Sequence, residues 1–187
     1  MPSNFEKKSI EIIQDMDQAI LVLRNVSKWL KESGKNLSKW WKLENLNRDF
    51  LLQYAKPEEF YVALVNGKPA ATAILQLNQN SQNWHCVDKN KPSTAMYIHW
   101  LCVDRQFAGR GISKVMIDFA EHQAKNQNIK LLRVDTNADE MKLRHIYEDL
   151  GFHLVAIEQE DYRKTAFYQK NIRNSSPNKL IKKNKIK

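Results

Sequence analysis

The sequence predicts a mixed α/β (α+β) fold, in which a mostly antiparallel central sheet contains one parallel segment and carries helices on both faces. Two observations predict it. Two β-rich runs flank the dipeptide Asn66-Gly67, which favours an antiparallel hairpin because both residues tolerate positive φ. Further on, an apolar run ending at Val103 precedes a helical pattern and a second buried run, which is the order of a parallel strand–helix–strand unit. The parallel segment is therefore expected near Val103.

The N-terminal part of the chain predicts one strand and two helices. Residues 8–14 are expected to form a short strand, since apolar and polar side chains alternate there. Asp15 then suits a helix N-cap, because apolar residues recur after it at spacings of three and four, and Gly34 suits the helix end. A second helix is expected over residues 45–54.

The middle of the chain predicts the hairpin and the central strand. The hairpin strands are residues 60–65 and 69–77, and the polar, irregular stretch 78–93 is expected to be a long loop. The apolar run 94–103 is predicted to be a central buried strand, because a strand covered on both faces does not alternate.

The C-terminal part continues with helices and strands in turn. A helix is expected to begin near Ile112, followed by a buried strand over 130–136. The next helix, ended by Gly151, presents four apolar residues on one face, Leu143, Ile146, Tyr147 and Leu150. Residues 152–158 and 165–172 supply two last strands.

Length and charge indicate one domain with a basic tail. The chain has 187 residues, enough for one domain of average size. Its formal charge is +9, but six of the basic residues and none of the acids lie after residue 172, which leaves +3 for residues 1–172. We expect a single domain over 1–172 and a disordered tail over 173–187. The tail is either an anchor for nucleic acid or membrane, or a plain solvated end.

Cysteine content and hydropathy exclude several classes of protein. Cys86 and Cys102 are the only cysteines, so a disulfide framework is excluded. His85 and Cys86 are adjacent, but no second ligand pair has the spacing of a metal site, so no metal is expected. Since no apolar run approaches the roughly 18 residues of a membrane span, we expect a cytoplasmic protein that does not bind membranes.

A glycine-containing loop joins the central strand to the helix that follows it. Gly109 and Gly111 permit close backbone approach, and the first N–H groups of a helix lack internal partners. Together with the helix dipole and the charges of Arg110 and Lys114, this predicts a phosphate or diphosphate site, although a plain glycine turn is the simpler alternative. The loop lacks the P-loop pattern, and a dinucleotide fingerprint would need a third glycine at Lys114.

The segments YIHWLCVDRQFAGRGIS and LLRVDTNADEMKLRHIYEDLGF, preceded by YVALVNGKPAATAILQL, resemble the GNAT superfamily of acyl-CoA-dependent N-acyltransferases. The resemblance covers roughly residues 60–152. It implies a GNAT-like fold with acetyl-CoA as co-substrate. The family loop Gln/Arg-x-x-Gly-x-Gly/Ala then corresponds to Ala108, Gly109, Arg110, Gly111, Ile112 and Ser113. Ala108 and Ser113 depart from that pattern, and a register shifted by two residues would start at Gln106.

The resemblance also implies a mechanism. An amine attacks the thioester carbonyl of acetyl-CoA directly, and a backbone N–H of the splayed strand, within Leu101, Cys102 and Val103, polarises the carbonyl oxygen. Tyr147 occupies the family position of the acid that protonates the leaving thiolate, whereas the apolar pattern alone favours a core role for it. Glu140 replaces an Asn that is frequent in the family, so any contact of that Asn with the cofactor is in doubt.

His99 is the candidate base, because its ordinary pKa suits proton transfer at neutral pH. A core histidine is the alternative. Strand alternation predicts Tyr97, His99, Leu101 and Val103 on one face, with Trp100 and Cys102 on the other. Cys102 is expected to pack in the core rather than act as a nucleophile.

The predicted function is therefore an N-acetyltransferase that acts on a primary amine. The acceptor is a small molecule or a protein amine, and a homodimer is possible. Four tryptophans near the first helices and the long loop favour an aromatic acceptor pocket or ordinary core: Trp29, Trp40, Trp41 and Trp84. The alternative functions are a non-catalytic acyl-CoA-binding module and a basic-tailed nucleic-acid-binding protein, the second being disfavoured.

Overall fold

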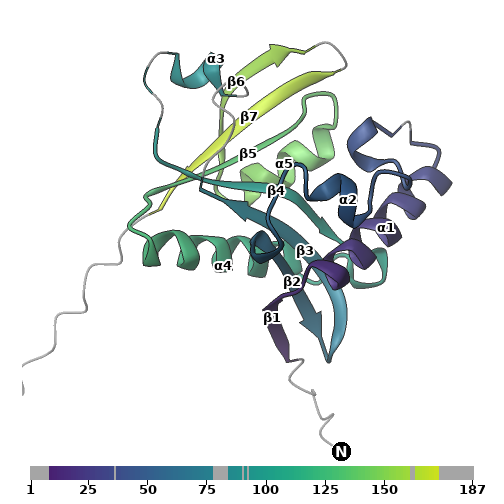
Figure 1. Ribbon diagram of the computed structural model, residues 1–187. Helices are drawn as coiled ribbons and strands as arrows, with labels where there is room; N and C mark the ends of the chain where they lie inside the picture. Colours follow the sequence, from purple (N-terminus) through teal and green to yellow (C-terminus); the bar gives the residue numbers. More distant parts are fainter. Residues whose placement is uncertain are drawn as a thin grey trace, which may run out of the picture.

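A seven-stranded sheet of order β1-β2-β3-β4-β5-β7-β6 forms the centre of the computed structural model (Figure 1). The structure describes residues 9–35, 37–77, 84–89, 91, 93–160 and 163–172, so the predicted tail 173–187 lies outside it. The strands are β1 (Ile10–Gln14), β2 (Phe60–Val65), β3 (Lys68–Gln76), β4 (Met96–Val103), β5 (Leu131–Asn137), β6 (His153–Gln159) and β7 (Lys164–Asn171). The helices are α1 (Met16–Glu32), α2 (Arg48–Leu51), α3 (His85–Asp88), α4 (Ile112–Asn126) and α5 (Met141–Asp149).

The predicted caps and turns of the N-terminal half are confirmed. Asp15 accepts a hydrogen bond from the backbone N–H of Gln18 at 3.0 Å and begins α1, and Gly34 follows the helix with φ +76°. Asn66 and Gly67 have φ of 50° and 76°, the left-handed pair that closes a two-residue hairpin between β2 and β3.

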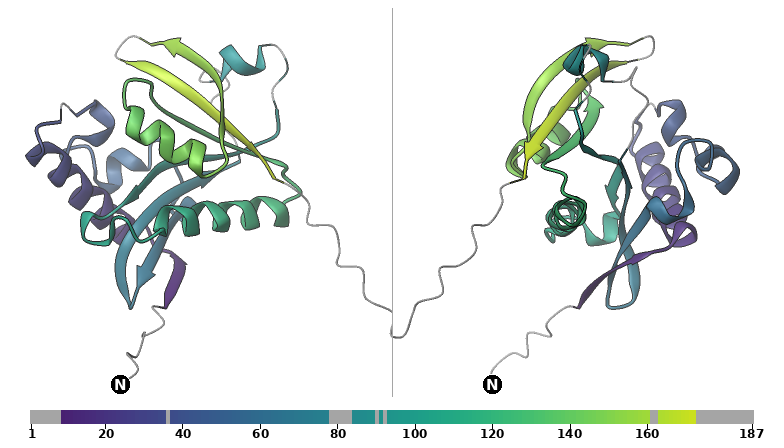
Figure 2. Two further views of the ribbon diagram at one scale, coloured as in Figure 1. Left: turned by 180° about the vertical axis from the view of Figure 1, so that it is seen from behind. Right: turned by 60° about the vertical axis from the view of Figure 1, so that its left-hand side comes forward.

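Helices cover both faces of the sheet, as predicted (Figure 2). On one face, Val22 and Leu23 of α1 pack with Val62 and Ile74 of the hairpin. On the other, α4 and α5 pack against β3, β4 and β7 through Met116, Ala120, Tyr147 and Phe152 among others. These two buried clusters lie on opposite faces of the sheet. The two faces of β4 therefore pack against different sets of side chains.

Three local predictions are wrong. The second helix is α2, only Arg48–Leu51, because the Asn47 side chain caps it by accepting from the Phe50 N–H at 2.9 Å. The expected loop 78–93 contains α3 in its described part, held by a bidentate pair between Asp88 and the buried Arg133. Ile146 of α5 is 45% exposed although the helical pattern placed it on the core face.

The parallel pairing lies at the start of β4, so the prediction that places it near Val103 is wrong. β4 and β5 pair only at Met96↔Leu132 and Tyr97↔Arg133, and beyond these positions the two strands diverge (Figure 1). Arg133 fixes the paired end, since its guanidinium also donates to the Tyr97 hydroxyl at 3.0 Å. The gap between β4 and β5 opens toward the C-terminal ends of both strands.

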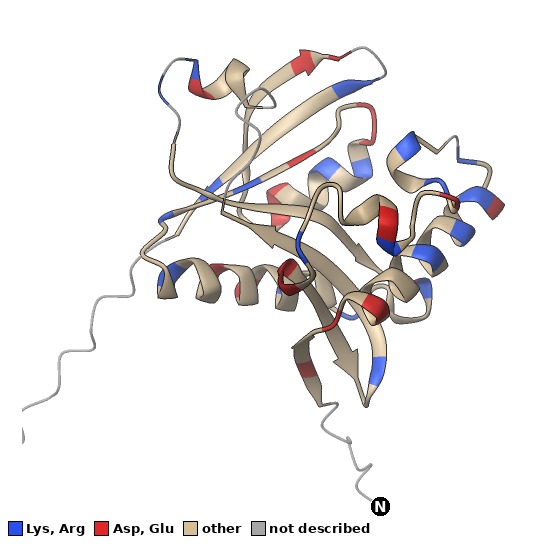
Figure 3. Ribbon diagram, in the orientation of Figure 1, with Lys and Arg blue, Asp and Glu red and all other residues tan. Residues whose placement is uncertain are grey.

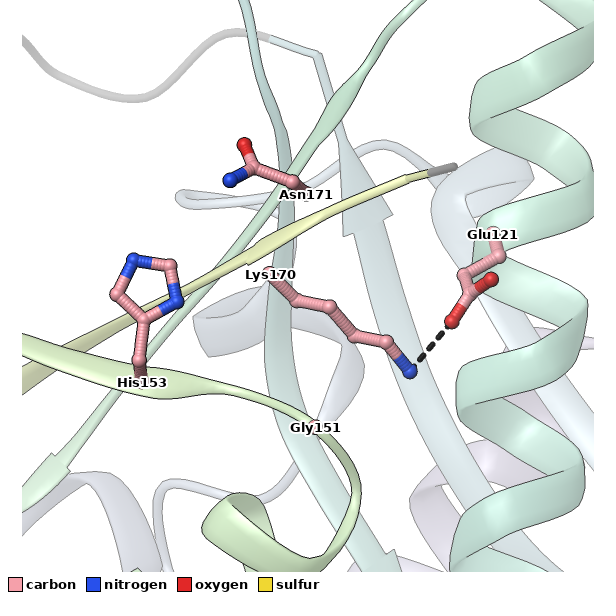
Figure 4. A pocket seen from close by; sticks show the side chains of 5 residues that line it. All are labelled: Glu121, Gly151, His153, Lys170 and Asn171. Atoms are coloured by element: carbon pink, nitrogen blue, oxygen red, sulfur yellow. Dashed lines mark ion pairs between the residues drawn. The ribbon is translucent and has the colours of Figure 1, made fainter. Parts of the chain in front are cut away.

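A surface cavity beside α4 is lined by Lys170, which links the sheet to the helices of one face (Figure 4). Lys170 of β7 forms an ion pair with Glu121 of α4 at 2.5 Å and donates to the Leu150 carbonyl at the end of α5 at 2.7 Å. Both charged side chains are 20% exposed. Lys170 therefore links β7 to the helices of one face.

We expect Lys170→Met to lower the free energy of unfolding by about 1 kcal/mol, because one partly buried ion pair and one hydrogen bond to a helix end are lost. Urea denaturation followed by circular dichroism measures the change. Lys164→Met, on an exposed position of the same strand, is the matched control. Equal stability of the two variants would show that the Lys170 contacts with Glu121 and Leu150 do not stabilise the fold.

Candidate active site

The glycine loop joins β4 to α4 and takes its shape from Asp104. This buried carboxylate accepts from the Gln106 N–H at 3.0 Å, which starts the short 3-10 helix η3 (Arg105–Phe107). Its second oxygen accepts from the Asn25 side chain of α1, also at 3.0 Å. α1 thus holds the loop from across the fold, and Figure 3 shows Lys and Arg residues along this helix.

The two glycines leave an open surface lined by N–H groups. Gly109 and Gly111 have φ of 73° and 74°, and an added Cβ at either position would meet nothing within 4 Å. The first backbone bond of α4 runs from the Val115 N–H to the Gly111 carbonyl at 3.3 Å, and the N–H groups of residues 109–114 donate to no other described residue. Such a set of donors at a helix N-terminus fits a diphosphate.

The remaining residues of the predicted cradle contribute less than expected. The Ala108 N–H already donates to the Arg105 carbonyl at 3.2 Å. The Arg110 guanidinium lies over the Phe107 ring at 5.5 Å, and Lys114 pairs with Asp118 of its own helix at 2.6 Å. The donors left for the predicted cradle are therefore mostly backbone N–H groups, including those of Ile112 and Ser113.

A β-bulge at Trp100 interrupts β4. Trp100 has φ +47°, and Ala73 of β3 lies opposite both Trp100 and Leu101, because Thr72 pairs with Cys102 and Ile74 with His99. A bulge leaves its extra residue outside the ladder and increases the local twist, which accounts for the divergence from β5. The backbone next to Leu101 is thereby exposed to the gap.

The bulge also overturns the predicted strand alternation. Leu101 and Val103 pack on the α4 face, together with Ile98, while Trp100 and Cys102 pack on the α1 face. The His99 ring stacks on the Tyr97 ring, with centroids 6.5 Å apart. His99 therefore lies on the opposite face of β4 from Leu101. The prediction that Tyr97, His99, Leu101 and Val103 share one face is therefore wrong, since one extra residue shifts every side chain after it.

Tyr147 is buried on the α4–α5 face, 6% exposed, with Phe152 and Tyr168 as ring neighbours at 5.8 and 6.1 Å. Burial raises the pKa of Tyr147 well above its ordinary value, and the charge of Asp135 acts in the same direction. The phenol is therefore protonated at neutral pH and able to donate a proton. The core role that the pattern favoured and the role that the resemblance implies are compatible.

His99 is half-buried on the opposite face, and burial lowers the pKa of its imidazole, while the charges of Asp135 and Glu59 partly oppose that shift. The imidazole is therefore neutral at pH 7 and able to accept a proton. Asp135 of β5 acts electrostatically on both His99 and Tyr147. Tyr147 packs on the α4 face of the sheet, and His99 belongs to the other face of β4.

Cys102 packs on the α1 face, and burial raises the pKa of its thiol, so it stays protonated as a packing cysteine. Asp135 of β5 forms an ion pair with Arg163 at 2.7 Å. Within the described ranges, no three or more His, Cys, Asp or Glu residues are grouped to hold a metal ion. In the same part of the chain, no helix has the length and hydropathy needed to cross a membrane.

The four tryptophans do not form one cluster. Trp84 is buried on Arg133, with the guanidinium 4.5 Å from its ring. Trp29 lies beside Arg105 at 5.2 Å. Trp40 contacts Trp100 at the bulge, with ring centroids 5.8 Å apart. Trp100 at the bulge and Glu59, whose charge acts on His99, belong to no recognisable motif, so the sequence does not indicate either of them.

Comparison with known proteins gives relatives over most of the chain. The chain is 22% identical over 153 residues to the uncharacterized N-acetyltransferase YesJ of Bacillus subtilis, covering 81% of this chain and 83% of that protein. A GNAT-family acetyltransferase structure from Streptococcus agalactiae matches with a TM-score of 0.65 at 19% identity, covering 92% and 100% of the two chains. The PaiA N-acetyltransferase of Thermoplasma acidophilum, solved in complex with coenzyme A, matches with a TM-score of 0.63 at 17% identity, covering 87% and 99%.

The structural matches agree with the mixed sheet and its single parallel pair. The sequence model of the acetyltransferase (GNAT) family matches residues 23–152, from α1 to the end of the Tyr147 helix. That is more than half of the chain. This protein therefore belongs to the GNAT family of acetyltransferases, for which acetyl-CoA is the co-substrate.

Proposed function

We propose that this protein is an N-acetyltransferase that moves the acetyl group of acetyl-CoA to a primary amine by direct attack, within one domain over residues 1–172. The observation that carries the proposal is the gap between β4 and β5. It lies next to the N–H cradle of residues 109–114, with Tyr147 on one side and His99 on the other. The expected cytoplasmic location and homodimer stay predictions.

The residues present have the chemistry that the transfer needs. The amine nitrogen attacks the thioester carbonyl, so that a C–N bond forms and the C–S bond breaks. A backbone N–H beside the bulge, within Leu101 to Val103, stabilises the negative charge that develops on the carbonyl oxygen. His99 takes the proton released by the amine, and Tyr147 donates a proton to the leaving thiolate. Free coenzyme A thiol and an amide are the products.

A thiol-release assay over a panel of primary amines tests the proposal, with acetyl-CoA binding measured separately by calorimetry. We expect release only when an amine is present. A non-catalytic acyl-CoA-binding module would bind acetyl-CoA without amine-dependent release. A nucleic-acid binder would instead show an affinity that falls steeply with salt and with deletion of residues 173–187.

The pH dependence tests the role of His99. Because the pKa of His99 lies below its ordinary value of 6.5, the imidazole is neutral at pH 7 and becomes protonated only at a lower pH. We therefore expect kcat/KM, calculated for the neutral amine, to be constant near pH 7. It should fall at acidic pH, because His99 becomes protonated there. His99→Gln should lower kcat/KM by about tenfold at pH 7, less than is usual for a general base because water can replace it, and should remove the fall at acidic pH. An unchanged profile in the variant would assign the fall to another group.

A further inference from the structure

A groove of about 610 Å³ opens between α2 and the start of β2, next to the proposed site. Its charged lining residues are Lys56, Glu58 and Glu59, so two acids face one base, and its polar lining includes Tyr54, Tyr61 and Gln76. Glu59 is held in a fixed position, because its Oε2 accepts from the Lys56 N–H and from Gln76 Nε2, both at 2.8 Å. The groove thus presents an anchored carboxylate.

Three aromatic rings connect this groove to the bulge, and we call them the aromatic wall: Trp40, Tyr54 and Trp100. Trp40 lies 4.9 Å from Tyr54 and 5.8 Å from Trp100, ring centroid to ring centroid, both edge to face. Tyr54 lines the groove, and Trp100 is the bulge residue beside Leu101. A molecule extending along this wall would reach from the carboxylate to the reacting carbonyl.

Sheet register gives the distance that such a molecule must cover. Ile74 pairs with Phe60 on β2 and with His99 on β4, so Phe60, the residue after Glu59, lies two strands across from His99. Neighbouring strands are about 4.8 Å apart, which places the two backbones about 10 Å from each other. The negative charge of Glu59 acts on the His99 imidazole across this distance.

The wall already accepts an ammonium group. The Lys39 Nζ lies 4.6 Å from the centre of the Trp40 ring, a cation–π contact made by the chain itself. The start of α1 adds negative charge on this side, since the Asp15 N–H bonds to the Phe60 carbonyl at 3.2 Å and brings Asp15 beside the first residue of β2. The Lys39 contact shows that the Trp40 ring can face an ammonium group, and the Asp15 carboxylate favours a positively charged acceptor over an anionic one.

We propose that the acceptor is a diamine or longer polyamine that lies along the aromatic wall, with one nitrogen attacking beside His99 and a second ammonium bound by Glu59. This inference rests on the proposed function and specifies its acceptor. The alkyl chain packs on the Tyr54 and Trp40 rings, and the carboxylate selects the second charge. An acceptor with a carboxylate in place of that second ammonium would be repelled.

Matched amine pairs test the second charge. Thiol release is measured with butylamine against 1,4-diaminobutane and with heptylamine against 1,7-diaminoheptane, with phenethylamine and 4-aminobutyrate added to the panel. We expect kcat/KM for at least one diamine to exceed that of its monoamine by about tenfold, as for a charge-assisted contact in a partly buried site. Phenethylamine and 4-aminobutyrate should be the poorer acceptors.

Glu59→Gln tests the assigned carboxylate. It keeps an oxygen for the bonds from Lys56 and Gln76, and should lower the diamine-to-monoamine ratio of kcat/KM about fivefold to tenfold. Glu11→Gln makes the same charge change on exposed β1, outside the groove, and should keep the wild-type ratio. Thermal unfolding checks that both variants are folded.

Each outcome decides between the two proposals. Release with monoamines but without a preference for diamines, a ratio unchanged by Glu59→Gln, or the highest kcat/KM with phenethylamine would overturn the polyamine acceptor and leave the acetyltransferase in place. No release with any amine, despite acetyl-CoA binding, would overturn the proposed function and the acceptor with it.

Discussion

Gly111→Val should abolish acetyl-CoA binding, with a loss of affinity of more than about 100-fold, since several charge-assisted hydrogen bonds to phosphate would be lost together. Gly111 has φ +74° and begins α4. A branched side chain cannot adopt this backbone conformation without strain, so the loop must move and its N–H groups turn away from a common point. The new side chain would also occupy the open space in which the diphosphate is proposed to bind.

Isothermal titration calorimetry with acetyl-CoA measures the effect. Gly67→Val is the matched control, because Gly67 has φ +76° and open space around it but lies in the β2–β3 hairpin. Both variants should lose stability from backbone strain, and only Gly111→Val should lose the ligand. Equal affinity in Gly111→Val and the wild-type protein would place the diphosphate elsewhere.

Tyr147→Phe should lower kcat by about 100-fold to 1,000-fold, the range for losing a positioned acid, and leave acetyl-CoA affinity nearly unchanged. The substitution keeps the buried ring and its contacts with Phe152 and Tyr168. Only the hydroxyl that would protonate the thiolate is lost. Because burial raises the pKa of Tyr147, the wild-type rate should show no loss from phenol ionisation up to the ordinary pKa of tyrosine.

Tyr168→Phe is the control for Tyr147→Phe. Tyr168 is a buried neighbour whose hydroxyl donates to Glu148 and accepts from Arg144, both at 2.9 Å, so its loss should lower stability while kcat stays near the wild-type value. If Tyr147→Phe retained full kcat with a good acceptor, the acid would have to be another group or water. Stopped assays with the same amine for both variants make the comparison direct.

Local signals account for what could be predicted of the fold. Asp15, Gly34 and the Asn66-Gly67 pair act within a few residues of themselves, and each is confirmed. The predicted helix over 45–54 is wrong for a local reason as well, because Asn47 inside this range acts as the N-cap of α2. The order of strands and helices followed from hydrophobic pattern, which long-range packing did not contradict.

The candidate site was only partly predictable, because its parts depend on contacts between distant residues. The cradle follows a local pattern of glycines before a helix, and Tyr147 came from the family resemblance. In contrast, the bond from Asn25 to Asp104 spans 79 residues, and nothing in either segment indicates it. Nor does a tryptophan in a strand suggest the positive φ of Trp100, which glycine would adopt more readily.

The extra residue in β4 lets one strand contribute side chains to both the proposed acceptor site and the proposed coenzyme A site. Leu101 and Val103 pack in the layer of α4 and Met116, whereas Trp100 and Cys102 pack in the layer of α1. Substitutions without shared partners combine additively in free energy. With the proposed roles, substitutions around Trp100 should change acceptor preference and leave coenzyme A binding unaltered, provided that Asn25 keeps its bond to Asp104.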